Sequence, residues 1–240
     1  MSEIAFVGGA TGYTGREVVR ALRARGIDTH AHVRPDSSAL ARYRSEFQGF
    51  GAHVDTTPWE EAAMIATMKR IKPTLVFALL GTTRARAKRA TKEGRDAAKE
   101  SYEAVDYGLT AMMLRACLAA ELHPRFLYVS SLGVSEGSAN PYLEVRARFE
   151  RELKASGVPY TIARPSFITG PDREESRPAE RYGAALADGL LSVIGVLGGH
   201  TLKARYASND AATLAHSLVA HALRPESVNA ELEGEALRLK

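Results

Sequence analysis

Short apolar runs alternate along the chain with longer segments in which apolar residues recur at helical spacing. The apolar runs predict strands over residues 4–7, 29–33, 52–55, 74–80, 126–129 and 160–163. The periodic segments between them predict helices over residues 16–25, 38–47, 60–70, 97–122 and 141–155. This alternation predicts an α/β protein with a doubly wound parallel sheet covered on both faces. The run TLVFALL at 74–80 is typical of a strand that is buried on both sides.

The last third of the chain departs from this regular alternation. Residues 169–181 are polar and contain proline, so they predict a loop over a site, and residues 182–197 predict an apolar helix. A strand over 203–207, a helix over 211–223 and a short strand over 235–239 complete the prediction. No repeat or linker divides the sequence, so residues 1–240 are expected to form one domain, with residues 165–240 as its small substrate side.

Glycines follow the first predicted strand at the spacing Gly9-x-x-Gly12-x-x-Gly15, directly before the first predicted helix. Such a turn binds the pyrophosphate of a dinucleotide, because Gly12 lets the backbone approach the phosphates and Gly15 lets the helix pack closely. The helix N-terminus adds N–H groups and the positive end of its dipole. The turn therefore predicts a Rossmann-type fold; a glycine-rich turn without a ligand is the alternative. The turn residues assigned to the cofactor are Gly9, Thr11, Gly12, Tyr13, Thr14 and Gly15.

Arg34 follows the second predicted strand, where folds specific for NAD carry an acid that binds the ribose hydroxyls. A basic residue there binds the 2′-phosphate of NADP instead, and the arginine fork suits a phosphate. Ser37 and Ser38 are expected to donate to the same group. The position therefore predicts NADP, as NADPH, for the cofactor. A solvated surface arginine is the alternative interpretation.

The loop after the fourth predicted strand is expected to line the ribose and nicotinamide side of the cofactor. Its assigned residues are Leu80, Gly81 and Thr82. The connection that follows, residues 82–95, is rich in arginine and lysine but has no interleaved aromatic residues. A solvated face is therefore favoured over a nucleic-acid interface.

Ser130 and Ser131 follow the fifth predicted strand, and Tyr142 opens the next predicted helix. Arg146 lies four residues further on, so it shares one face of that helix with Tyr142. A cation beside a phenol favours the phenolate. Such a tyrosine can donate a proton to a carbonyl oxygen as a hydride arrives, while a serine hydroxyl holds that oxygen. The alternative is a tyrosine at a helix start with an ordinary i,i+4 partner.

Several motifs occur in an order that resembles the short-chain dehydrogenase/reductase superfamily. They are GATGYTG at 9–15, HVR at 32–34, LLGTTR at 79–84, VDY at 105–107, VSSLG at 129–133, YLEVR at 142–146 and ARPSFITGP at 163–171. The ordered set is most similar to an atypical group, the NmrA-like and Tat-interacting-protein-like NAD(P)H-binding oxidoreductases. The matching motifs span most of the chain.

The resemblance implies a catalytic serine followed by Tyr-x-x-x-Lys. The serine maps onto Ser131, with Ser130 as the alternative, the tyrosine maps onto Tyr142, and Arg146 stands in the lysine position. Arginine keeps the charge, but its planar fork is not equivalent to a lysine, so turnover is expected to fall while cofactor binding survives. The family asparagine corresponds loosely to Asp106, and residues 169–181 would gate the substrate. Further cofactor contacts implied by the resemblance are Ser130, Pro165 and Ile168.

Two hypotheses of function follow. The first is an NADP-dependent oxidoreductase acting on a carbonyl or alcohol of a small organic molecule, with Ser131, Tyr142 and Arg146 as catalytic residues. The second is a non-catalytic module that senses NADP(H) and acts through a protein partner. The arginine in the lysine position moves weight towards the second hypothesis.

Composition narrows the class of protein further. The 240 residues carry a net charge of +4 and one cysteine, Cys117, which excludes an intrachain disulfide. The histidines and the cysteine lack metal-ligand spacing, and no apolar run is long enough to cross a membrane. We therefore expect a cytoplasmic protein without a metal site or a membrane or nucleic-acid partner. The apolar segment 112–120 is expected to pack in the core or against a second copy of the chain.

Overall fold

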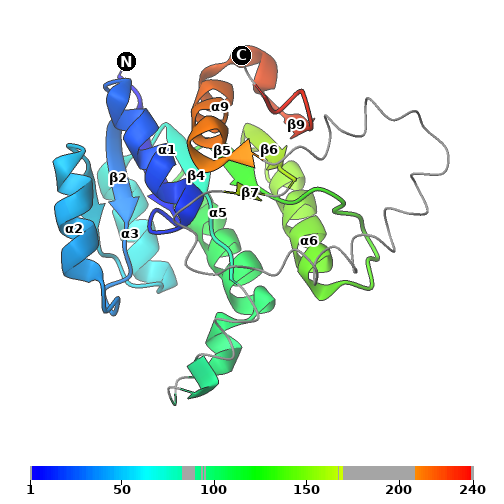
Figure 1. Cartoon of the computed structure of the whole chain (residues 1–240), viewed down its shortest axis with the longest axis horizontal. Helices are drawn as coiled ribbons and strands as arrows, with labels where there is room; N and C mark the ends of the chain where they lie inside the picture. Colours follow the sequence, from blue (N-terminus) through cyan, green and yellow to red (C-terminus); the bar gives the residue numbers. More distant parts are fainter. Residues whose placement is uncertain are drawn as a thin grey trace.

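The computed structural model of the protein describes residues 2–82, 90–92, 94, 96–166, 168–169 and 209–238. These residues form a seven-stranded parallel sheet with helices on both faces (Figure 1). The strands are β1 (Ile4–Gly8), β2 (Asp28–His32), β3 (His53–Asp55), β4 (Leu75–Ala78), β5 (Arg125–Val129), β6 (Tyr160–Arg164) and β9 (Ala230–Glu233). The predicted Rossmann-type doubly wound sheet is confirmed.

The order of the strands is β3-β2-β1-β4-β5-β6-β9, and it reverses between β1 and β4. The chain runs outward from β1 through β2 to β3, and then returns to place β4 on the other side of β1. At such a switch point the loops after the two central strands diverge to opposite faces of the sheet. In folds of this class, ligands bind there, beyond the carboxyl ends of the strands.

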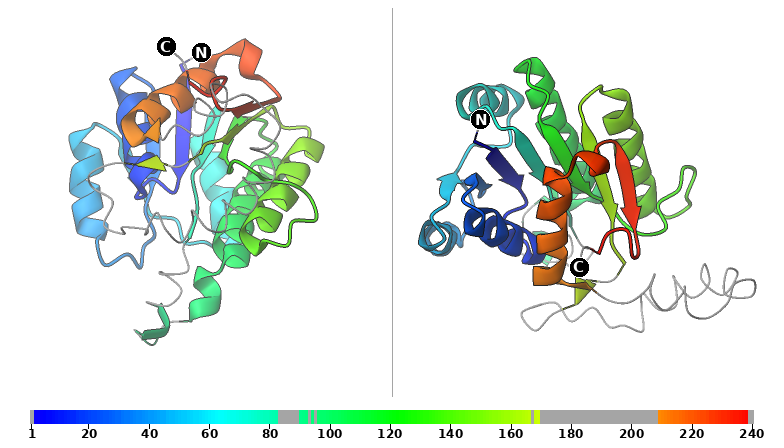
Figure 2. Two further views of the ribbon diagram at one scale, coloured as in Figure 1. Left: turned by 45° about the vertical axis from the view of Figure 1, so that its right-hand side comes forward. Right: turned by 90° about the horizontal axis from the view of Figure 1, so that it is seen from above.

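The helices form two layers (Figure 2). One face is covered by α1 (Tyr13–Ala24), α2 (Leu40–Gly49) and α9 (Ala211–Leu223). The other is covered by α3 (Glu61–Ile71), α5 (Thr110–Ala119) and α6 (Pro141–Ala155). Strand β4 serves both layers, because Phe77 packs in one apolar cluster and its neighbour Val76 in the other. This explains the continuous apolar run that predicted a strand buried on both faces.

The single long helix predicted over residues 97–122 is wrong. The segment divides into a 3₁₀-helix η1 (Ala97–Glu100), a π-helix η2 (Tyr102–Leu109) and α5. Ser101 is extended, with φ −78° and ψ 161°, and its Oγ accepts a hydrogen bond of 3.1 Å from the N–H of Ala104. This side-chain cap starts a new helix where apolar spacing alone shows no break. The apolar side of α5, including Met113 and Cys117, is buried in the core.

The final strand predicted over residues 235–239 is also wrong. The strand is β9, a few residues earlier, and it pairs in parallel with β6. Gly234, with φ +54°, ends it, and residues 234–237 form turns. The sequence of β9, AELE, alternates polar and apolar residues at the edge of the sheet, and its glutamates pair with Arg164 and Lys154. A strand that is stabilised by ion pairs with residues far away in the sequence lacks the apolar run from which a strand is predicted.

Other predicted elements are confirmed with small shifts of their ends, and α6 and α9 begin and end where predicted. Ile168–Thr169 form a short strand β7, which pairs with β8 (Asn209–Asp210). The predicted helix over 182–197, the strand over 203–207 and most of the loop 169–181 lie outside the described residues. The basic residues between positions 83 and 89, and Arg95, do so as well.

Candidate functional site

The glycine turn joins the end of β1 to the start of α1. Gly9 has φ +81°, and a Cβ there would lie 2.6 Å from the carbonyl carbon of Leu79. A Cβ on Gly15 would lie 2.1 Å from the carbonyl oxygen of Gly9. Glycine is therefore required at both positions, the first by its backbone conformation and by the loop after β4, the second by the turn itself. The N–H of Gly12 closes the turn on the carbonyl of Gly9 at 3.0 Å.

The N-terminus of α1 is suited to an anion. Gly12 is its N-cap, so no side chain caps the helix, and the first turn contains no acidic residue. The first N–H groups of a helix have no carbonyl partner within it, and they lie at the positive end of the helix dipole. Thr11 and Thr14 are half-buried beside this turn. A phosphate at this position would meet backbone N–H groups and the positive end of the helix dipole.

Arg34 lies just after β2, as predicted, but acidic residues surround its guanidinium. Its Nη1 is 3.5 Å from Oε1 of Glu100, and its Nε is 3.8 Å from Oδ1 of Asp36. Ser37 donates its N–H to the carbonyl of Arg34, and its Oγ accepts from the N–H of Ala39 at 3.4 Å. Glu100 gave no signal in the sequence, because it belongs to η1, far along the chain.

The second half of the site is a buried network around Arg146. Its Nη2 donates to Oδ1 of Asp106 and its Nη1 to the carbonyl of Val129, both at 2.7 Å. The other carboxylate oxygen of Asp106 accepts the N–H of Thr82 at 3.0 Å. Nη1 of Arg146 also donates to the Tyr128 hydroxyl at 3.3 Å. One guanidinium thus fixes η2, the end of β5 and the loop after β4 against α6.

Tyr142 is held by its ring. The guanidinium carbon of Arg146 lies 4.7 Å from the ring centroid, and the ring of Tyr102 meets it edge-on at 5.2 Å. Burial by itself lowers the pKa of Arg146, but the surrounding phenols and the Asp106 carboxylate outweigh it and raise that pKa. Arg146 therefore carries its charge at every physiological pH. The cation lies over the face of the phenol ring, in a cation–π contact.

The two serines differ in their hydrogen bonds. Ser130 is buried, and its hydroxyl donates to Oε1 of Glu150 at 2.5 Å. Ser131 is half-buried, and its hydroxyl makes a long contact of 3.4 Å to the carbonyl of Leu132. The N–H of Leu132 donates to the carbonyl of Pro165 at 3.1 Å, which joins the loops after β5 and β6. The hydroxyl of Ser131 therefore makes the weaker hydrogen bond of the two.

Ile168, a predicted cofactor contact, lies in β7, and its side chain is outside the described residues.

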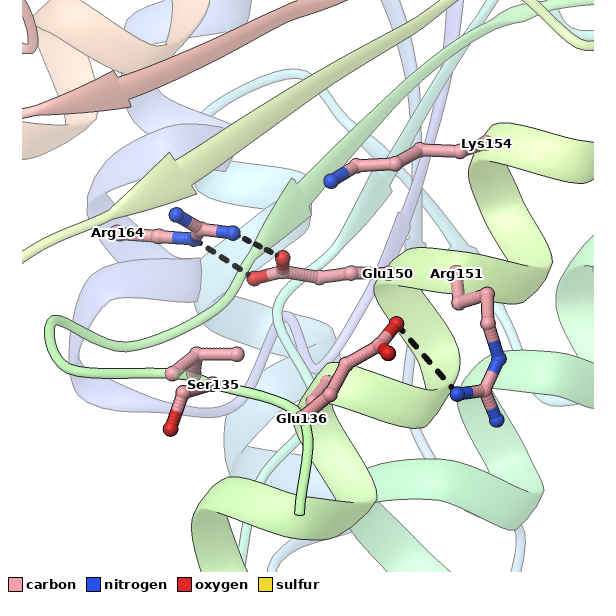
Figure 3. A pocket seen from close by; sticks show the side chains of 8 residues that line it. Ser135, Glu136, Glu150, Arg151, Lys154 and Arg164 are labelled. Carbon is pink, nitrogen blue, oxygen red and sulfur yellow. Dashed lines mark hydrogen bonds and ion pairs between the residues drawn. The ribbon is translucent and has the colours of Figure 1, made fainter. Parts of the chain in front are cut away.

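Glu150 also lines a cavity, shown in Figure 3. The volume of this cavity is about 160 Å³. Glu150 accepts two hydrogen bonds from Arg164, and Arg151 pairs with Glu136 at 3.5 Å. The hydrogen bond to Glu150 is the main reason why the pKa of Arg164 is raised. Three cations and two acids line this cavity, and the third cation, Lys154, pairs with Glu231 of β9. Glu150 thus links Ser130 to Arg164 of β6, and Arg164 in turn pairs with Glu231 of β9.

The loop after β4 brings the two halves of the site together. Its first residues, Leu79 and Leu80, contact the glycine turn at Gly9. At Gly81, a Cβ would lie 3.3 Å from Nη2 of Arg146, and Thr82 binds Asp106. The glycine turn and the Arg146–Asp106 pair therefore both contact this loop. Glu100, Tyr102 and Glu150 also belong to the site, although the sequence did not predict them. None of the three gave a signal in the sequence, because their partners Arg34, Tyr142 and Ser130 lie far away along the chain.

Fold and site together define a Rossmann-type protein that binds a nicotinamide dinucleotide. The chain belongs to the NAD(P)H-binding family, whose model matches residues 9–189. It is 32% identical over 195 residues to the Aspergillus terreus protein named fmp52-1, mitochondrial, covering 78% of this chain and 76% of that protein. The protein named fmp52, mitochondrial, from Aspergillus fumigatus is also 32% identical, over 75% of this chain and 72% of its own.

A solved structure of an isoflavone reductase is similar with a TM-score of 0.64 at 16% identity, covering 97% of this chain and 69% of that chain. A structure described as AtPrR2 with NADP+ and (+)pinoresinol has a TM-score of 0.63 at 15% identity, covering 96% and 69%. At this identity, the likeness shows the Rossmann-type fold alone.

The relatives also correct one expectation. The cytoplasmic location expected from the sequence is wrong, because the matching relatives are named as mitochondrial proteins. Across the described ranges, none of the helices has the length and apolar character needed to traverse a bilayer. The same residues contain no group of three side chains arranged to hold a metal ion.

Proposed function

We propose that the protein is an NADP-dependent oxidoreductase of the short-chain dehydrogenase/reductase type, which acts on a carbonyl or alcohol of a small organic molecule. One observation carries this proposal: the loop after β4 contacts the glycine turn at Gly9 and the Arg146–Asp106 pair next to Tyr142. A dinucleotide bound at the turn would thereby have its reactive end beside a fixed tyrosine and the hydroxyl of Ser131.

The described residues fit such a cofactor. The turn has no side chain at Gly9, Gly12 or Gly15, so its backbone N–H groups can approach a pyrophosphate closely. The buried Oγ1 of Thr82 and Nε of Arg146 have no hydrogen-bond partner in the described part of the chain. Both are polar atoms that a ribose or a carboxamide group could satisfy. When bound, NADPH supplies the hydride.

Each catalytic residue has a distinct role in this proposal. Tyr142 donates the proton to the carbonyl oxygen, and Ser131 holds that oxygen with its hydroxyl. Arg146 fixes the ring of Tyr142 from one side, and its permanent charge stabilises a developing phenolate. Pro165 contacts the nicotinamide side of the cofactor in this proposal.

A second candidate is the non-catalytic NADP(H) sensor. It is favoured by the hydrogen bonds of Arg146, because both of its terminal nitrogens are engaged by Asp106 and Val129. The variant Arg146→Lys distinguishes the two functions. A latent enzyme should gain activity in NADPH oxidation with the carbonyl probe phenanthrenequinone. A sensor should bind NADPH equally well and remain at the background rate.

The proposed cofactor is tested by calorimetric titration of the full chain with NADPH and, separately, with NADH. We expect Arg34→Ala to weaken NADPH about tenfold to a hundredfold, because charge-assisted hydrogen bonds to the 2′-phosphate are lost. NADH should change far less. Arg115→Ala, which removes an arginine from a surface pair with Glu61, is the matched control. Equal weakening of both nucleotides by Arg34→Ala would refute the 2′-phosphate role, and failure of the wild type to bind either would refute both functions.

A further inference from the structure

Glu100 places a buried carboxylate at the position where the proposed function requires a phosphate. Its Oε1 lies 3.5 Å from Nη1 of Arg34. The Arg34 side chain is 41% exposed and that of Glu100 only 6%. The guanidinium therefore reaches solvent, and one of its terminal nitrogens lies against a carboxylate that solvent does not reach.

Two acids lie beside Arg34, but they are not equivalent. Asp36 is 76% exposed, at 3.8 Å, so water and salt screen its interaction with the guanidinium. The carboxylate of Glu100 is excluded from water, where charges interact more strongly over the same distance. Glu100 is thus the acid that an incoming anion would meet at Arg34.

The position of Glu100 is fixed by its own segment. It is the last residue of η1, which Asp96 caps by accepting the N–H of Ala98 at 2.9 Å. Ser101 then caps η2. From η2, the ring of Tyr102 contacts the ring of Tyr142, and the carboxylate of Asp106 accepts a hydrogen bond from Arg146. In Figure 1 the part of the chain that precedes α5 extends past the carboxyl ends of the strands. The segment thus contacts both ends of the proposed cofactor site.

The two nicotinamide cofactors differ at the atom that would face this pair. NADPH carries a 2′-phosphate with up to two negative charges, which would be repelled by Glu100 while it is attracted by Arg34. NADH carries a neutral 2′-hydroxyl, which can donate a hydrogen bond to a carboxylate. Glu100 therefore disfavours the binding of NADPH and is compatible with the binding of NADH.

Building on the NADP-dependent function proposed above, we propose that Glu100 is a cofactor-specificity residue that competes with the 2′-phosphate for Arg34. Binding of NADPH requires Arg34 to turn from Glu100 to the phosphate, and binding of NADH does not. The preference of the protein for NADPH over NADH is consequently smaller than Arg34 alone would produce.

The test is Glu100→Gln in the full chain, which keeps the shape and removes the charge. Dissociation constants for NADPH and NADH are measured by calorimetry. The affinity for NADPH should rise on the order of tenfold, as expected for removing one like charge from a partly buried site, while NADH changes less than about threefold. Glu103→Gln is the matched control, because Glu103 lies three residues on and pairs at the surface with Arg148. It should leave both affinities unchanged.

The outcomes separate the two proposals. If the wild type prefers NADPH and Arg34→Ala removes that preference, but Glu100→Gln shifts both nucleotides equally or neither, the inference about Glu100 is wrong and the proposed function stands. If the wild type binds neither nucleotide, both fail. Should Glu100→Gln not fold, Glu100→Asp retracts the carboxylate from Arg34 and should give a smaller gain for NADPH. No gain in that variant would equally overturn the inference.

Discussion

The guanidinium of Arg146 donates to the carboxylate of Asp106 at 2.7 Å, and both side chains are almost entirely buried. The pair joins the π-helix η2 to α6, and Asp106 also holds the backbone of Thr82. A buried pair of this kind contributes little net stability relative to an apolar substitute, but it is costly to break. It therefore fixes the arrangement of the site.

Removing one member of the Arg146–Asp106 pair should lower the stability of the protein. Asp106→Ala leaves the Arg146 charge and the N–H of Thr82 without their acceptor, so we expect the free energy of unfolding to fall by about 3–5 kcal/mol. Urea unfolding followed by circular dichroism measures it. The control is Glu103→Ala, which breaks a surface pair with Arg148 and should cost less than about 1 kcal/mol. Equal costs for the two variants would contradict the assignment.

Tyr142→Phe tests the proposed proton donor. The contacts with Arg146 and Tyr102 are made by the ring, so phenylalanine keeps the packing and loses only the hydroxyl. NADPH oxidation with phenanthrenequinone should slow by about 10²-fold or more, while the dissociation constant for NADPH stays the same. Tyr107→Phe is the control, because that hydroxyl donates to Glu152. A rate within a few-fold of wild type in Tyr142→Phe would exclude the catalytic role.

Gly15→Ala tests the geometry of the turn. The new Cβ would lie 2.1 Å from the carbonyl oxygen of Gly9, so the turn must shift. We expect a loss of about 1–3 kcal/mol in unfolding free energy, together with weakened NADPH binding. Gly49→Ala, at the end of α2, has no atom within 4 Å of the added Cβ and should leave both quantities nearly unchanged. Wild-type binding by Gly15→Ala would mean that the turn does not hold the cofactor.

Buried histidines predict a loss of stability in mild acid. Burial lowers the pKa of His32, whose Nε2 lies 2.8 Å from the carbonyl of Thr57. In the unfolded chain a histidine has a pKa of about 6.5. Below that pH the unfolded chain binds a proton that the folded protein refuses, so the stability falls as the pH decreases. Urea midpoints measured from neutral pH to about pH 5 should decrease, and His32→Asn should flatten the slope. An unchanged slope in that variant would assign the effect to other groups.

Local sequence was sufficient for the first six strands of the sheet and for the glycine turn after β1. Apolar runs and helical spacing act over a few residues, glycine at position 15 is required by the backbone of the turn itself, and glycine at position 9 is favoured by its positive φ. The placement of Tyr142 and Arg146 on one face of α6 follows from the helical repeat for the same reason. These features depend on physics that operates between near neighbours in the chain.

Only the tertiary structure decided which partners the charged residues have. Arg146 finds Asp106 40 residues away, and Ser130 finds Glu150 20 residues away. Arg34 faces Glu100 although its position along the chain indicated a free phosphate-binding arginine. The break at Ser101 and the edge strand β9 were missed because a side-chain cap and distant ion pairs create them. Electrostatic partners are chosen by proximity in space, which apolar periodicity does not encode.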